Sequence, residues 1–218
     1  FWLHLGTAVS ALIMLRIEVM AVVQNILRNP LEPNKPALFL LVATIVSAMV
    51  GFPMLLGIEE LSKHIGFMVM GFVGLFMLCT GAAQVWLRGD RGVREKKTLT
   101  PLDAVITGIA QGFAVLPGLS RSGLTITALL ARRVDRRESL VLSFLLSIPA
   151  SVGAALYMVS RNQIDVSASA LVAVLVAAGV GCVTIRILME LANKVNFGNF
   201  VIIIGLTMII GTLLYALS

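Results

Sequence analysis

The stretch VLPGLSRSGLTITALLARR, Val115 to Arg133, places an arginine between two serines in otherwise apolar sequence. Membrane-spanning segments avoid arginine because its charge is costly to bury in lipid. No carboxylate lies close to Arg121 in the sequence to pair with it. Pro117 and Gly118 also prevent a single continuous helix from running through the stretch. Two questions follow: how the chain folds here, and which negative charge Arg121 binds.

The composition is that of an integral membrane protein. Of the 218 residues, 58% are hydrophobic and only 13% are charged, whereas soluble domains carry about 25% charged residues. The two cysteines, Cys79 and Cys182, lie inside apolar segments. We interpret them as small hydrophobic packing residues, because their number and spacing give no disulfide framework or metal-ligand pattern.

Six stretches are apolar enough to form membrane-spanning helices, each of which needs about 20 residues. They are Phe1–Leu15, Ala37–Leu56, Ile65–Leu87, Leu140–Val159, Val166–Leu188 and Phe200–Leu217.

A different element, Leu102–Leu130, lies between the third and fourth of these stretches. It consists of two short apolar pieces, Leu102–Leu116 and Ser122–Leu130, separated by PGLSRSG. Neither piece is long enough to cross a bilayer alone. Irregular backbone at membrane depth persists only where protein or a water-filled cavity surrounds it. The sequence therefore predicts a re-entrant helix pair with its tip inside the membrane.

The distribution of basic residues supports the same layout. All but Lys63, Arg121 and Arg161 of the 17 Lys and Arg residues fall in four stretches. These stretches are Arg16–Pro36, Arg88–Thr98, Arg132–Glu138 and Arg186–Asn196. The positive-inside rule places all four in the cytoplasm, which requires 102–130 to enter and leave on one face. Basic loops near anionic lipid account for the net charge of +6, so membrane lipids are expected partners and nucleic acid is not.

Three spans before the helix pair and three after it predict two units of opposite orientation. The expected fold is all-α and integral to the membrane, with inverted repeats of three transmembrane helices, residues 1–98 and 99–218. A re-entrant pair opens the second repeat. Aligning Lys63 with Lys194 matches Gly74 with Gly205 and Met77 with Met208. The first repeat's pair is absent, and because the chain begins with Phe1 rather than Met, we expect residues before it.

The residues around Arg121 are suited to binding an anion. Gly118 and Gly123 allow backbone amides to approach a ligand closely, and Ser122 is the predicted N-cap of the second short helix. The amides and dipole at that helix start favour negative charge. The guanidinium of Arg121 presents a planar pair of donors to phosphate oxygens. At membrane depth, the expected ligand is a phosphate or diphosphate on a lipid.

Two alternatives remain open from the residues alone. Arg121 could extend to a lipid head group while the serines only cap a helix. His4, near one end of the first span, could be a satisfied packing residue or could take part in the site.

PGLSRSGLT, preceded by GIAQGFAVL, resembles the second signature of the undecaprenyl-diphosphate phosphatase family, the bacitracin-resistance membrane phosphatases. FLLSIPASVGA and FWLHLGTAVSAL are also similar to that family, so the resemblance covers essentially the whole chain. It implies two re-entrant pairs in inverted repeats in the plasma membrane. The implied reaction is hydrolysis of a polyprenyl diphosphate to the monophosphate and phosphate, which recycles the carrier lipid for cell-wall polysaccharide synthesis. The resemblance also implies dependence on a divalent cation, Mg²⁺ or Ca²⁺. A homodimer is a separate expectation.

Carried over residue by residue, the resemblance assigns catalytic roles to Arg121, Ser120 and Thr125. It assigns substrate binding to Gly118, Ser122, Gly123 and Gln111, and it identifies no metal ligand in this sequence. The family's other signature, an acidic stretch followed by a Pro-x-Ser-Ser-Thr-Gly-His element, is absent and is expected before Phe1. A transporter that moves a polyprenyl phosphate or another anion between leaflets is the rival function, because broken helices in inverted repeats also suit that class.

Overall fold

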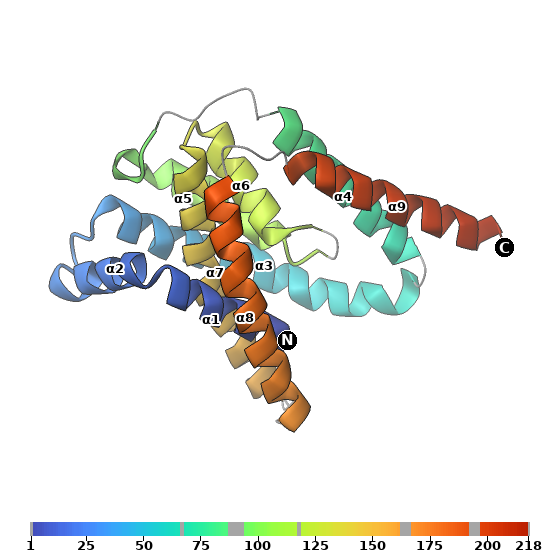
Figure 1. The fold of residues 1–218 in the computed structure, drawn as a ribbon, viewed down its shortest axis with the longest axis horizontal. Helices are drawn as coiled ribbons and strands as arrows, with labels where there is room; N and C mark the ends of the chain where they lie inside the picture. The colour runs from blue at the N-terminus through green and yellow to red at the C-terminus, as the bar shows by residue number, and fades with distance from the viewer. Residues whose placement is uncertain are drawn as a thin grey trace.

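The computed structural model describes residues 2–65, 68–86, 94–116, 119–161, 167–191 and 197–217, and within these ranges the regular structure is helical (Figure 1). Each of the six predicted spans is a helix. They correspond to α1 (Trp2–Met14), α3 (Lys35–Ile65), α4 (Met68–Trp86), α7 (Arg136–Ser160), α8 (Ala168–Leu191) and α9 (Phe197–Leu217). The all-α prediction is thus confirmed.

Three helices among the described residues are long and apolar enough to cross a membrane: Lys35–Gly57, Arg136–Val159 and Ala168–Glu190. Within α4 and α9 the described apolar segments are shorter, Val73–Ala83 and Gly205–Leu214. The chain is therefore a multi-pass membrane protein, and the spanning role of α1, α4 and α9 stays a prediction.

The sequence did not predict α2 (Arg16–Arg28), a helix in a stretch interpreted as a loop. It follows α1 after a bend of 84°, at the buried Leu15. Apolar residues recur at helical spacing at Ile17, Met20 and Leu27, and all three are exposed. This periodicity, with Glu18 in the first turn and Arg28 in the last, favours a helix.

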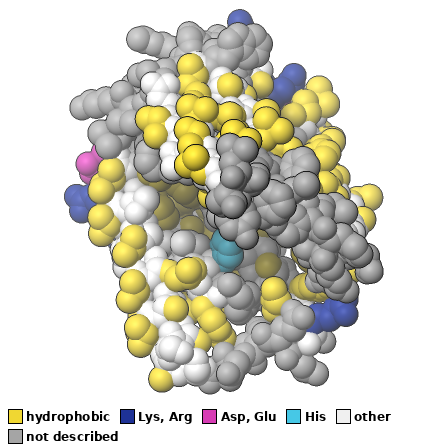
Figure 2. Space-filling model, turned by 90° about the vertical axis from the view of Figure 1, so that its right-hand side faces the viewer, with side chains coloured by type: hydrophobic (Ala, Val, Ile, Leu, Met, Phe, Trp, Pro, Cys, Tyr) yellow, Lys and Arg dark blue, Asp and Glu magenta, His cyan; other side chains and the backbone are white. Residues whose placement is uncertain are grey.

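The helices pack so that the largest buried side chains lie where α3, α6 and α7 meet. Phe39, Leu129, Leu142 and Leu146 are almost fully buried there. By contrast, α8 exposes many aliphatic side chains. Figure 2 shows one face on which hydrophobic side chains are spread widely and the charged ones lie at the edges. Such a surface suits contact with lipid rather than water.

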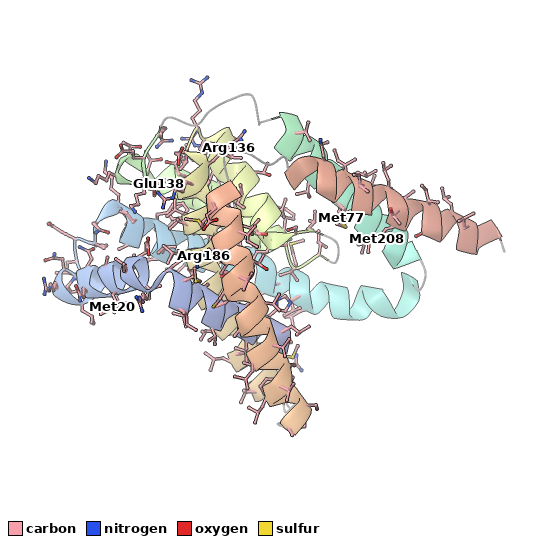
Figure 3. The ribbon with its side chains drawn as sticks, viewed as in Figure 1. Met20, Met77, Arg136, Glu138, Arg186 and Met208 are labelled. Atoms are coloured by element: carbon pink, nitrogen blue, oxygen red, sulfur yellow. The ribbon has the colours of Figure 1, made fainter. Side chains whose placement is uncertain are left out.

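The two glycines matched by the repeat alignment lie at one helix crossing. A Cβ added to Gly74 on α4 would lie 2.8 Å from the carbonyl oxygen of Gly205 on α9, and one added to Gly205 would lie 2.9 Å from that of Gly74. Met77 and Met208, also matched, belong to the same two helices (Figure 3), and a Cβ added to Gly205 would lie 3.1 Å from Met77 Cβ. A two-fold axis through this crossing would bring equivalent residues together in this way.

The helix ends that carry the basic stretches lie toward one side of the molecule. In Figure 1 the turn from α2 to α3, the start of α5, the end of α6 and the start of α7 lie to the left and top. The ends of α3, α7 and α9 lie to the right and bottom. This separation agrees with the predicted sidedness, although the orientation in a membrane stays a prediction.

Candidate active site in a re-entrant hairpin

The stretch around Arg121 forms a hairpin of two short helices, α5 (Pro101–Phe113) and α6 (Arg121–Ala131). At 1.5 Å per residue their 13 and 11 residues extend about 20 and 16 Å. The hydrocarbon core of a bilayer is about 30 Å thick, so neither helix spans it. The two helices begin and end close to the predicted boundaries.

Ion pairs and hydrogen bonds join the two ends of the hairpin. We call the four residues that form them the base cluster: Arg94, Thr100, Asp103 and Arg132. The side chain of Asp103, in the first turn of α5, is fully buried. Its Oδ2 lies 2.8 Å from Arg94 Nη2, and its Oδ1 lies 2.6 Å from Nε of Arg132, just past α6. Arg94 also donates to the carbonyl oxygen of Arg132 at 2.9 Å. The two ends of the hairpin therefore lie together, as entry and exit on one membrane face would require, and the membrane face itself stays a prediction.

Asp103 is held in its ionised form by these neighbours. Burial alone would raise the pKa of its carboxyl, but hydrogen bonds from Arg94, Arg132 and Thr100 outweigh burial and hold the pKa well below its ordinary value. Sequence analysis missed this role. The signal was present, because Thr100, Pro101 and Asp103 form a capping box with proline at the first helical position.

One face of α5 lies directly against α3. A Cβ added to Gly108 would lie 2.8 Å from the carbonyl oxygen of Ala43, and one added to Gly112 would lie 2.6 Å from Val50 Cβ. Gln111 is buried on α5, and its Nε2 donates to Ser47 Oγ on α3 at 3.1 Å. Its Oε1 has no hydrogen-bond partner among the described residues. The structure thus places Gln111 in the contact with α3, and its predicted role in substrate binding stays a prediction.

The start of α6 differs from the prediction by two residues. Ser120, not Ser122, is the N-cap, and its Oγ accepts from the amide of Gly123 at 3.2 Å. The reason is geometric: Ser120 has extended backbone and stands three residues before Gly123, the spacing that a capping side chain requires. Ser122 lies in the first turn with an exposed side chain, 3.4 Å from Ser120 between hydroxyl oxygens. Gly118 lies outside the described residues.

Two backbone amides at this helix start have no acceptor among the described residues. The first N–H groups of a helix have no acceptor within it. The Gly123 amide is occupied by Ser120 Oγ and the Leu124 amide by the carbonyl oxygen of Ser120. The amides of Arg121 and Ser122 donate to no described residue. They lie at the positive end of the α6 dipole.

Arg121, the first residue of α6, has a partly buried side chain. None of the ion pairs between described residues includes its guanidinium, which also makes no hydrogen bond to them. Nearby, His4 at the start of α1 carries an exposed side chain that interacts electrostatically with Arg121. An unpaired, partly desolvated guanidinium beside free amides is an arrangement that an anion would complete.

The hydroxyl of Thr125 points into the protein. Its side chain is 0% exposed, and its Oγ1 lies 2.9 Å from the carbonyl oxygen of Arg121 and 2.7 Å from Ser143 Oγ on α7. The catalytic role predicted for Thr125 stays a prediction. Its position indicates that it holds the backbone at Arg121.

The described residues do not by themselves supply a divalent-cation site. Nowhere in that part of the chain do three His, Cys, Asp or Glu side chains come together. The carboxylate of the hairpin, Asp103, has both oxygens engaged by Arg94, Arg132 and Thr100. Near Arg121 the described side chains offer hydroxyls and the single imidazole of His4, but no carboxylate of the kind that Mg²⁺ or Ca²⁺ prefers.

These features define an integral membrane protein in which a hairpin of two short helices carries an arginine suited to an anionic head group. A model of the family described as bacitracin resistance protein BacA matches residues 1–211, and the chain therefore belongs to the BacA family. This confirms the resemblance drawn from the P-G-x-S-R-S-G-x-T sequence.

Curated relatives carry the name undecaprenyl-diphosphatase. The protein of Methanococcoides burtonii is 32% identical, over 94% of this chain and 78% of its own length. That of Haloarcula marismortui is 35% identical, over 99% of this chain and 82% of its own length. That of Elusimicrobium minutum is 35% identical, over 92% of this chain and 76% of its own length.

Proposed function

We propose that this protein is a lipid diphosphate phosphatase that hydrolyses undecaprenyl diphosphate to undecaprenyl phosphate and inorganic phosphate. The product is the carrier lipid that cell-wall polysaccharide synthesis uses again. One observation carries the proposal: Arg121, unpaired by any described carboxylate, lies at the start of α6 beside backbone amides and hydroxyls that can bind an anion. Family membership and the names of the relatives support the reaction.

In the proposed reaction, water adds to the terminal phosphorus and the bridging P–O bond of the diphosphate breaks. The terminal phosphoryl group leaves as inorganic phosphate, and the bridging oxygen remains on the lipid phosphate. Arg121 binds two phosphate oxygens through its planar guanidinium and stabilises negative charge that develops during transfer. The free amides of Arg121 and Ser122 bind further oxygens at the helix start. Phosphoryl transfer depends mainly on such positioning and charge.

The serines of the loop act as ligands rather than as the attacking group in this proposal. Ser120 Oγ already accepts from the Gly123 amide, and no His, Asp or Glu among the described residues bonds to it. A serine nucleophile needs an adjacent base. We therefore assign Ser120 and Ser122 to phosphate binding, with Gly118 and Gly123 leaving room for the ligand.

Several further features belong to the same proposal. The units 1–98 and 99–218 are inverted repeats, which the Gly74–Gly205 crossing supports. The protein resides in the plasma membrane with its basic stretches in the cytoplasm. The dependence of activity on Mg²⁺ or Ca²⁺ follows from the family resemblance alone, and chelation with EDTA tests it. A homodimeric state is a separate prediction, which size analysis in detergent tests.

Phosphate release by the purified full chain tests the function. We expect release of inorganic phosphate from undecaprenyl diphosphate in detergent, with loss of release in Arg121→Ala. If the protein moves undecaprenyl phosphate between the leaflets of proteoliposome membranes but releases no phosphate from undecaprenyl diphosphate, it is instead a transporter. Release that persists undiminished in Arg121→Ala would remove the site assignment while leaving the activity in place.

A further inference from the structure

A line of buried serines runs along one face of α7. Ser139, Ser143, Ser147 and Ser151 follow one another at intervals of four residues, and all four are at most 7% exposed. Residues four apart lie on one helix face. Ser147 donates to the carbonyl oxygen of Phe144 in its own helix, at 2.6 Å. Ser143 instead reaches another helix, since its Oγ lies 2.7 Å from Thr125 Oγ1 on α6.

The direction of this contact follows from the donors present. A hydroxyl has one hydrogen to donate and two lone pairs. Thr125 Oγ1 lies 2.9 Å from the carbonyl oxygen of Arg121 and 3.2 Å from that of Ser122, and carbonyl oxygens only accept. Thr125 therefore donates to these carbonyls, and Ser143 donates to Thr125. The result is a relay from α7, through the Thr125 hydroxyl, to the backbone of Arg121.

We propose that Ser143 is a positioning residue for the phosphatase reaction and acts on Arg121 through Thr125. The proposal rests on the proposed function of Arg121. Arg121 is the first residue of α6, where few helical hydrogen bonds restrain the backbone. No described ion pair fixes its guanidinium. The relay therefore ties the first turn of α6 to α7, a helix long and apolar enough to span the membrane.

Loss of the Ser143 hydroxyl should affect the reaction more than substrate binding. A displaced guanidinium still attracts the diphosphate, but it no longer meets the charge that develops in the transition state. Misplacement by about 1 Å can cost on the order of a hundredfold in rate. We expect Ser143→Ala to lower kcat about tenfold or more while KM changes less than about threefold.

The matched control is Ser147→Ala, one turn further along the same buried face. It removes a buried hydroxyl whose hydrogen bond among the described residues stays within α7, so the kcat of Ser147→Ala should stay within about twofold of the parent. Because Ser143 acts through the Thr125 hydroxyl, adding Ser143→Ala to Thr125→Val should lower kcat little further. If the double variant instead lowers kcat by the product of the two single factors, the two residues act independently and the proposed relay is wrong.

The experiment measures kcat and KM for phosphate release from undecaprenyl diphosphate by the full chain and its variants in detergent, with thermal unfolding as the check on folding. If the parent releases no phosphate, the proposed function fails. If the parent is active and Arg121→Gln is not, equal kcat values for Ser143→Ala and Ser147→Ala overturn the present inference alone. Should Ser143→Ala fail to fold, Ser143→Cys keeps nearly the same volume with a weaker donor. A kcat for Ser143→Cys well below that for Ser147→Cys then supports the inference, and equal kcat values overturn it.

Discussion

Replacing Asp103 by asparagine should destabilise the hairpin strongly, because Asp103 joins its two ends. The change keeps the shape but removes the charge that pairs with Arg94 and Arg132. Removing one partner of a buried ion pair costs about 3–5 kcal/mol. The two arginine side chains are 25% and 32% exposed, so water can partly solvate them and the lower end, about 3 kcal/mol, applies.

This loss converts into a measurable shift of the unfolding temperature. For a chain of this size, each 1 kcal/mol lowers Tm by about 2–4 °C, so Asp103→Asn should lower it by about 6–12 °C. The assay is thermal unfolding of the purified chain in detergent, followed by far-ultraviolet circular dichroism.

Glu138→Gln provides the matched control for the loss of a carboxylate near the same end of the hairpin (Figure 3). Glu138 pairs with Lys96 at 3.8 Å, and both side chains are partly exposed. Such a pair contributes at most about 1 kcal/mol, so its Tm should fall by less than about 4 °C. A Tm for Asp103→Asn no lower than that of Glu138→Gln would refute the role of the base cluster.

Three further predictions concern the hairpin. Gly108→Ala should destabilise the protein by about 1–3 kcal/mol in SDS unfolding, because the new Cβ meets a backbone oxygen of α3; Gly153→Ala, with open space around it, should not. Ser120→Ala should cost about 1 kcal/mol and speed hydrogen exchange at the Gly123 amide, and equal exchange in Ser120→Ala and Ser122→Ala would contradict the capping assignment. Since the pKa of Asp103 is lowered in the folded protein, its contribution is complete above about pH 4 and is lost as pH falls further. Below that pH, Tm should fall less in Asp103→Asn than in the parent protein. Equal falls in the two proteins would show that Asp103 does not cause the acid sensitivity.

The membrane layout could be predicted from the sequence because lipid imposes local constraints. A run of about 20 apolar residues has few alternatives to a spanning helix, and the six stretches chosen on this basis are helices. The break at Pro117 and Gly118, with basic residues on both sides, predicted the hairpin. The contact between Arg132 and Asp103 shows that the two helices form a hairpin, and its re-entry into the membrane stays a prediction.

The contacts that position Arg121 could not be predicted in this way. Arg94 and Arg132 are 38 residues apart, and Thr125 and Ser143 are 18 apart. Their pairing depends on how α5, α6 and α7 pack. Basic residues assigned only to membrane sidedness, Arg94 and Arg132 among them, also bind Asp103. Helix α2 was missed because its charged ends were given more weight than its apolar periodicity.

The central claim is that the guanidinium of Arg121 binds the diphosphate and stabilises its reaction. Its most direct test compares phosphate release from undecaprenyl diphosphate by the full chain, Arg121→Gln and, as a control for loss of one arginine, Arg161→Gln. Arg161 lies at the far end of α7, beside Tyr157. Loss of one transition-state donor costs about 10²–10³ in kcat, so Arg121→Gln should fall by that factor while Arg161→Gln keeps the parent rate. A folded Arg121→Gln that releases phosphate as fast as Arg161→Gln would contradict the claim.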